Sequence, residues 1–61
     1  MTPATLLAWR ERLGIRSRAD AARRLGVARN TYAAYEEGTR RIPLYIALAC
    51  AALAHGVPPA Q

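Results

Sequence analysis

The amino-acid sequence predicts one small all-α domain covering residues 1–61. Apolar residues recur three and four positions apart in several segments, which is the spacing of one face of a helix. Each of the four glycines comes directly after such a segment, where a left-handed residue commonly ends a helix. No segment alternates apolar and polar residues as a half-buried strand does. With 61 residues and one cysteine, the chain has a small core and cannot form an internal disulfide.

The first two helices are expected over residues 3–13 and 17–25. Thr2 followed by a proline is typical of a helix start, because threonine caps the first amide groups and proline fits the first helical position. Ser17 starts the second helix and forms a weak capping box with Asp20. Most charged residues of these helices are expected on the outside. The inward stripes are formed by Leu6, Trp9 and Leu13 in the first helix and by Ala21, Ala22 and Leu25 in the second.

Two further helices are expected, over residues 28–37 and 43–55. The third has Tyr32 and Tyr35 on its inward face. A basic loop separates it from the fourth helix, which is the most apolar part of the chain. Residues 57–61 contain two prolines, which cannot continue a helix, so we expect a frayed or loosely docked tail there.

The charge balance indicates a nucleic-acid partner. The formal net charge is +5, and all nine basic residues are arginine, whose planar guanidinium suits phosphates and guanine edges. A GC-rich genome also favours arginine over lysine. The indication of a nucleic-acid partner is therefore the excess of positive charge, and not the choice of arginine. The start of the chain lacks a basic leader segment, and the apolar residues 42–54 are too few to span a bilayer. We therefore expect a cytoplasmic protein.

Residues 18–37 carry most of the information about function. They predict two short helices joined by a turn of about three or four residues that contains Gly26, a spacing that crosses two helices at a steep angle. Ala21 and Ala22 allow the helices to approach closely, and Gly26 can adopt a positive φ. The angle between the helices is filled by Leu25, Val27, Tyr32 and Tyr35.

These residues resemble the lambda-repressor/Cro-type (XRE) helix-turn-helix proteins. The resemblance extends from Leu6 to Leu53 and includes the spacing of Ala22 and Gly26. It continues in the segment Tyr35-Glu36-x-Gly38-x-Arg40-x-Ile42-Pro43. It implies a compact domain of four to five helices around a central helix-turn-helix at residues 18–37, with double-stranded DNA as the partner. It also implies a bacterial or phage-encoded protein that associates with the nucleoid when bound.

In this family the third helix lies in the major groove, with its N-terminal residues at the base edges. The resemblance places Arg29 and Asn30 at these reading positions, where arginine suits guanine and asparagine suits adenine. The full set of expected base-reading residues is Arg18, Arg29, Asn30, Ala33 and Ala34. For Arg18, at the start of the second helix, a phosphate contact is the alternative to reading a base. The expected phosphate contacts are Arg10, Thr31, Thr39, Arg40 and Arg41. An ordinary solvated role is the alternative, and for Arg10 the two are equally favoured.

Several features depart from the family pattern. Arg18 stands where glutamine is common, which leaves the base preference open. One extra residue lies between Gly14 and Ser17, and Tyr32 fills a position that usually holds an aliphatic side chain. Ala28 replaces the usual serine or threonine N-cap of the third helix, a loss worth about 1 kcal/mol.

The fourth helix is apolar on all sides, which indicates burial against more than one surface. Its inward stripe is formed by Ile42, Ile46, Ala49, Cys50 and Leu53. A monomer this small cannot cover the remaining faces, so we expect a homodimer. The expected interface comprises Leu44, Tyr45, Leu48, Ala52 and His55.

A twofold dimer implies a pseudo-palindromic DNA site. We expect a transcriptional regulator, most simply a repressor of phage or mobile-element type that controls its own operon. The alternative is a protein-interaction module, antitoxin-like or heteromeric, in which the fourth helix binds a different protein and DNA binding is secondary.

Other function classes find little support in the sequence. Cys50 and His55 have no partners of metal-binding or nucleophilic type, so we expect no enzyme, no cofactor and no metal site. No small-molecule ligand or membrane contact is evident. Trp9, Tyr32 and Tyr35 could stack on single-stranded bases, but their inward positions favour core packing.

Overall fold

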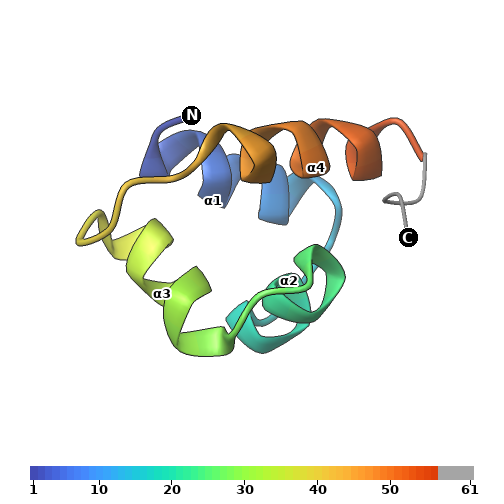
Figure 1. Cartoon of the computed structure of the whole chain (residues 1–61). Helices are drawn as coiled ribbons and strands as arrows, with labels where there is room; N and C mark the ends of the chain where they lie inside the picture. Colours follow the sequence, from blue (N-terminus) through green and yellow to red (C-terminus); the bar gives the residue numbers. More distant parts are fainter. Residues whose placement is uncertain (57–61) are drawn as a thin grey trace.

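The computed structural model describes residues 1–56, which contain four helices and no strand. The expected tail at residues 57–61 lies outside the described residues. All four helix positions predicted from the sequence are confirmed to within one residue at each end, and no fifth helix occurs in the described part of the chain. The helices are α1 (Pro3–Arg12), α2 (Arg18–Leu25), α3 (Arg29–Glu37) and α4 (Leu44–Ala54) (Figure 1).

The helix ends show why the chain folds where it does. The hydroxyl of Thr2 accepts a 3.2 Å hydrogen bond from the backbone N–H of Thr5, and that of Ser17 accepts one of 3.1 Å from the N–H of Asp20. Ala28 precedes α3 without a side-chain cap, as the sequence predicts. Gly26 ends α2 with a φ of 74°, a left-handed value that residues with a side chain resist, and the chain turns directly into α3.

One hydrophobic core joins all four helices. It is formed by the buried residues Leu6, Trp9, Ile15, Ala21, Ala22, Tyr32, Tyr35, Ile46 and Cys50. Trp9 Nε1 donates a 2.8 Å hydrogen bond to the carbonyl of Cys50, which links α1 to α4 and satisfies the buried indole. Trp9, Tyr32 and Tyr35 therefore serve the core and are not presented to single-stranded bases. Ile15 is a core residue that helical periodicity cannot reveal, because it lies between α1 and α2.

The helices separate into two groups in Figure 1. α1 and α4 lie along one side of the molecule, and α2 and α3 lie along the other. α3 packs against both α2 and α1, so it is held from two directions while its remaining surface faces outward. None of the helices formed by residues 1–56 combines the length and apolarity that a membrane span requires.

Candidate nucleic-acid interface

An open hollow lies between the first turns of helices α2 and α3. The turn at residues 26–28 joins the two helices, which pack closely against each other. The hollow has a volume of about 380 Å³ and is lined by Ser17, Arg18, Ala19, Arg29, Asn30 and Ala33. The structure thus brings Arg18, Arg29, Asn30 and Ala33, four of the five residues predicted to read bases, to the border of one hollow. Ala34 is half-buried and lies outside this lining.

Arg29 and Asn30 form an exposed, positively charged start to α3. Neither side chain makes a hydrogen bond or an ion pair with another group of residues 1–56. The first turn of α3 contains no acidic residue. The partial positive charge of the helix N-terminus therefore adds to the charge of Arg29. This end of α3 is suited to an electron-rich partner that offers hydrogen-bond acceptors.

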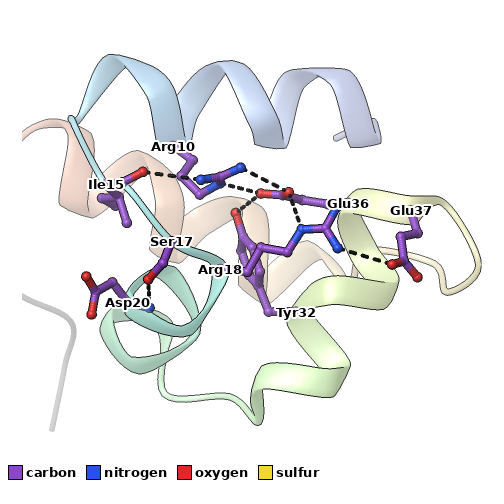
Figure 2. Close-up of polar contacts among 8 residues, drawn as sticks. All are labelled: Arg10, Ile15, Ser17, Arg18, Asp20, Tyr32, Glu36 and Glu37. Atoms are coloured by element: carbon purple, nitrogen blue, oxygen red, sulfur yellow. Dashed lines mark hydrogen bonds and ion pairs between the residues drawn. The ribbon is translucent and has the colours of Figure 1, made fainter.

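A second polar feature is a network centred on Glu36, which sequence reasoning missed (Figure 2). Arg10 donates to both oxygens of Glu36, from Nε at 2.6 Å and from Nη2 at 3.3 Å. Arg18 Nε donates to Glu36 Oε1 at 3.0 Å, and the Tyr32 hydroxyl donates to Oε2 at 2.6 Å. Arg18 Nη1 also donates to Glu37 Oε2 at 3.1 Å. The network therefore connects α1, α2 and α3 through one carboxylate.

The network keeps its members in fixed protonation states at neutral pH. Burial alone would raise the pKa of Glu36, but the hydrogen bonds from Arg10, Tyr32 and Arg18 outweigh it and hold that pKa below its ordinary value. The hydrogen bond to Glu36 raises the pKa of the Arg10 guanidinium. Burial and the hydrogen bond to Glu36 raise the pKa of Tyr32, so its hydroxyl remains a donor. Glu36 stays ionised and is surrounded by donors.

Arg10 does not lie where the sequence suggests. We expected an outward side chain on α1 with a possible phosphate contact, but the Arg10 side chain is only 16% exposed and Glu36 only 4%. Arg10 Nη1 also donates to the carbonyl of Ile15 at 3.3 Å. Because these donors are engaged inside the protein, we leave Arg10 out of the proposed DNA contacts. The sequence contains one indication of this network. Tyr32 and Glu36 are four residues apart, which puts a carboxylate one helical turn beyond a buried tyrosine.

The other expected phosphate contacts lie in and after α3. Thr39, Arg40 and Arg41 are exposed, and Thr31 is half-buried. The Thr39 hydroxyl donates to the carbonyl of Ala34 at 3.4 Å. Arg40 and Arg41 border a second hollow, of about 480 Å³, beside the start of α1. The loop therefore adds two exposed guanidinium groups beyond the C-terminal end of α3.

Helix α4 has an uncovered apolar face. Leu44, Tyr45 and Leu48 are 74%, 64% and 62% exposed, although Ile46 and Cys50 on the opposite side of the same helix are buried. The two other residues expected at an interface differ from each other, since Ala52 is half-buried and His55 is exposed. Nothing within residues 1–56 covers this face.

The pairing of α2 with α3 agrees with a known family. A family model that describes helix-turn-helix proteins matches residues 6–60 of the chain. The chain belongs to the XRE-type helix-turn-helix family. It is therefore a DNA-binding transcription regulator of this type, with α2 and α3 as the helix-turn-helix. No curated protein and no solved structure matches the chain.

In an XRE-type regulator the second helix of the motif is the recognition helix, which here is α3. The Glu36 network therefore attaches the recognition helix to α1 and to the start of α2. Such an attachment holds α3 at a defined angle, so that its first turn projects from a rigid support. Among residues 1–56 there is no group of three or more His, Cys, Asp or Glu side chains placed to hold a metal ion.

Proposed function

We propose that this XRE-type regulator binds a pseudo-palindromic DNA site as a homodimer and represses transcription from a promoter that overlaps the site. The observation that carries the proposal is the hollow between α2 and α3, at whose edge Arg29 and Asn30 have no partner within residues 1–56. The side chains of Arg24 and Thr31 also lack a partner there, but Arg29 and Asn30 are the exposed pair that borders the hollow at the start of the recognition helix.

The chemistry of the two residues fits base edges in the major groove. Arginine can donate twice to O6 and N7 of guanine, and asparagine can pair with N6 and N7 of adenine. Ala33 lies one turn further along the same surface and is small enough to approach a thymine methyl group. Ala34 contributes only if the groove wraps around α3, since it lies outside the hollow.

The proposed phosphate contacts lie beside this reading surface. Arg40 and Arg41 are exposed in the loop that follows α3, and Thr39 precedes them. Thr31 lies in the first turns of α3, next to Asn30. Contacts of this kind set affinity and register but carry no sequence information.

The exposed face of α4 supports the homodimer. Burying Leu44, Tyr45 and Leu48 against a second copy would remove three large apolar side chains from water. Full burial of such a side chain is worth about 1.5–3 kcal/mol, a large increment for a domain of this size. Ala52 and His55 extend the same face toward the C-terminal end of α4.

Selection of bound duplexes from a random DNA pool tests the DNA part of the proposal. We expect two inverted half-sites whose centres are about 34 Å apart, one turn of B-DNA. Arg29→Ala should relax base preference at one position of each half-site, a change of about 1–3 kcal/mol in discrimination. Arg40→Ala should weaken all sequences alike and lower the salt slope by about 1. A uniform loss for Arg29→Ala would contradict the assignment of Arg29 as a reader.

Sedimentation measurements test the dimer. The wild-type chain should sediment as a dimer at tens of micromolar, and Leu48→Glu should sediment as a monomer. Leu7→Glu is the matched control, since Leu7 is an exposed leucine on another helix, α1, and is not among the proposed interface residues. A wild-type monomer, with and without DNA, would exclude the homodimer. In that case the exposed face of α4 favours the second candidate, a module that binds a different protein.

A further inference from the structure

Glu37 lies on the face of α3 that we propose enters the major groove. Residues 30, 33 and 37 are spaced three and four apart, so Glu37 shares one side of the helix with Asn30 and Ala33. Its side chain is 54% exposed. A carboxylate at this position is doubly unfavourable, because it adds to the negative end of the helix dipole and faces the phosphates of a bound duplex.

Arg18 neutralises this carboxylate. Its guanidinium donates to Glu37 through Nη1 at 3.1 Å and to Glu36 through Nε at 3.0 Å. Figure 2 shows the Arg18 side chain reaching from α2 to the two glutamates of α3. The same residue borders the hollow between the helices. Arg18 is thus a cation at the edge of the proposed DNA surface that forms ion pairs with two glutamates of the same chain.

The structure allows Arg18 to leave these acids. If it does, Glu36 still has Arg10 on both oxygens and the Tyr32 hydroxyl on one. Glu37 is exposed, so water replaces the lost donor. Arg18 itself is 42% exposed, and ion pairs of such exposure are weak. Arg10, in contrast, is held by both Glu36 and the Ile15 carbonyl.

We propose that Arg18 exchanges Glu37 for a DNA phosphate when the regulator binds its site, so that Glu37 is an internal competitor that weakens binding. The inference rests on the proposed function. A phosphate is favoured over a base because the guanidinium lies beside the last turn of α3, whereas bases meet the first turn of a recognition helix. Glu37 thereby sets the affinity of the regulator without contacting DNA.

A double-mutant cycle on DNA affinity tests the exchange. The probes are the duplex recovered by selection and an unrelated duplex of equal length. Glu37→Gln should tighten binding about two- to fivefold, because Arg18 no longer has to leave that ion pair. Arg18→Met should weaken binding more in the Glu37→Gln background than in the wild type, by about the same two- to fivefold factor.

The sign of the coupling decides between exchange and simple neutralisation. If Arg18 stays on Glu37 in the complex, Arg18→Met should weaken binding less in the Glu37→Gln background, and the exchange is then wrong. Equal effects in both backgrounds overturn it as well. Asp20→Asn is the matched control, because it removes an exposed acid that pairs with Arg23 on α2. It should show no coupling to Arg18→Met.

Two further measurements complete the test. Arg18→Met should lower the salt slope by about 1 and act alike on all sequences, as expected for a phosphate contact. A loss confined to one base position would overturn the assignment of a phosphate. Circular dichroism of each variant confirms that it is folded. If the wild-type chain binds no duplex at all, the proposed function fails; if it binds and the cycle shows no coupling, only the exchange fails.

Discussion

Removal of the Arg10 guanidinium is the sharpest perturbation of the network that supports the recognition helix. Arg10→Met keeps the apolar part of the side chain but deletes three hydrogen bonds, two to Glu36 and one to the Ile15 carbonyl. Glu36 then keeps only Arg18 and Tyr32 as donors, although its carboxylate is 4% exposed. The nearly buried negative charge of Glu36 is therefore left with fewer hydrogen-bond donors and without its closest cation.

The size of the effect follows from this geometry. Removing one partner of a fully buried ion pair costs about 3–5 kcal/mol, because the other charge stays buried. Arg10 is partly exposed and two donors to Glu36 remain, so we expect a loss of roughly 2–4 kcal/mol in the free energy of unfolding. A core of this size supplies no more than about 3–5 kcal/mol, so the variant should be close to unfolded at room temperature.

Urea unfolding followed by circular dichroism measures this loss. Arg12→Met is the control, because Arg12 is an exposed arginine on the same helix and its replacement should cost less than about 0.5 kcal/mol. A loss below about 1 kcal/mol for Arg10→Met at neutral pH would refute the reasoning.

The pH dependence provides an independent check on the same variant. The pKa of Glu36 is lowered in the folded state, so its contribution to stability is complete above the unfolded pKa and is lost as the pH falls through the folded pKa. Arg10→Met removes the main donor to Glu36, so the carboxyl protonates at higher pH and its buried charge disappears sooner. The difference in the free energy of unfolding between Arg10→Met and the wild type should therefore become smaller at acidic pH. A difference that is independent of pH would show that Glu36 is not its source.

The remaining predictions concern the stability of the fold. Ser17→Ala should lower the free energy of unfolding by about 1 kcal/mol, because α2 loses its N-cap. Ala28→Ser should raise the free energy of unfolding by about 0.5–1 kcal/mol, because it supplies the missing N-cap of α3. Urea unfolding measures both changes. Gly26→Ala should cost roughly 1–2 kcal/mol purely through its φ of 74°, since nothing lies within 4 Å of the added methyl group, and Gly26→Asn should cost less. Burial raises the pKa of the Cys50 thiol from 9.0 to about 11, so the unfolded state loses this proton first and the free energy of unfolding should fall as the pH rises from 9 to 11. Cys50→Ala should reduce this dependence of stability on pH. An unchanged dependence would show that the thiol does not contribute.

Local features of the amino-acid sequence are enough to place the four helices. Thr2, Ser17 and Gly26 act on the backbone within a few residues of themselves, and helical periodicity separates the inward from the outward side of each helix. These are local effects, which is why the predicted ends agree with the structure to within one residue. The same local reasoning located Arg29 and Asn30 at the start of α3, where they border the hollow.

The packing of the helices, in contrast, sets which arginines are available to a partner. Arg10 and Arg18 lie 26 and 18 residues from Glu36 in sequence, and no local pattern predicts that both reach one carboxylate. Ile15 enters the core for a similar reason, because its burial depends on how the loop after α1 packs rather than on a helical face. Local sequence sets backbone conformation, whereas the pairing of charges depends on distances that exist only after the helices have packed. In this regulator the packed helices leave three arginines in three different states. Arg29 has no partner within residues 1–56, Arg10 is largely buried against Glu36, and Arg18 is paired at the edge of the proposed DNA surface.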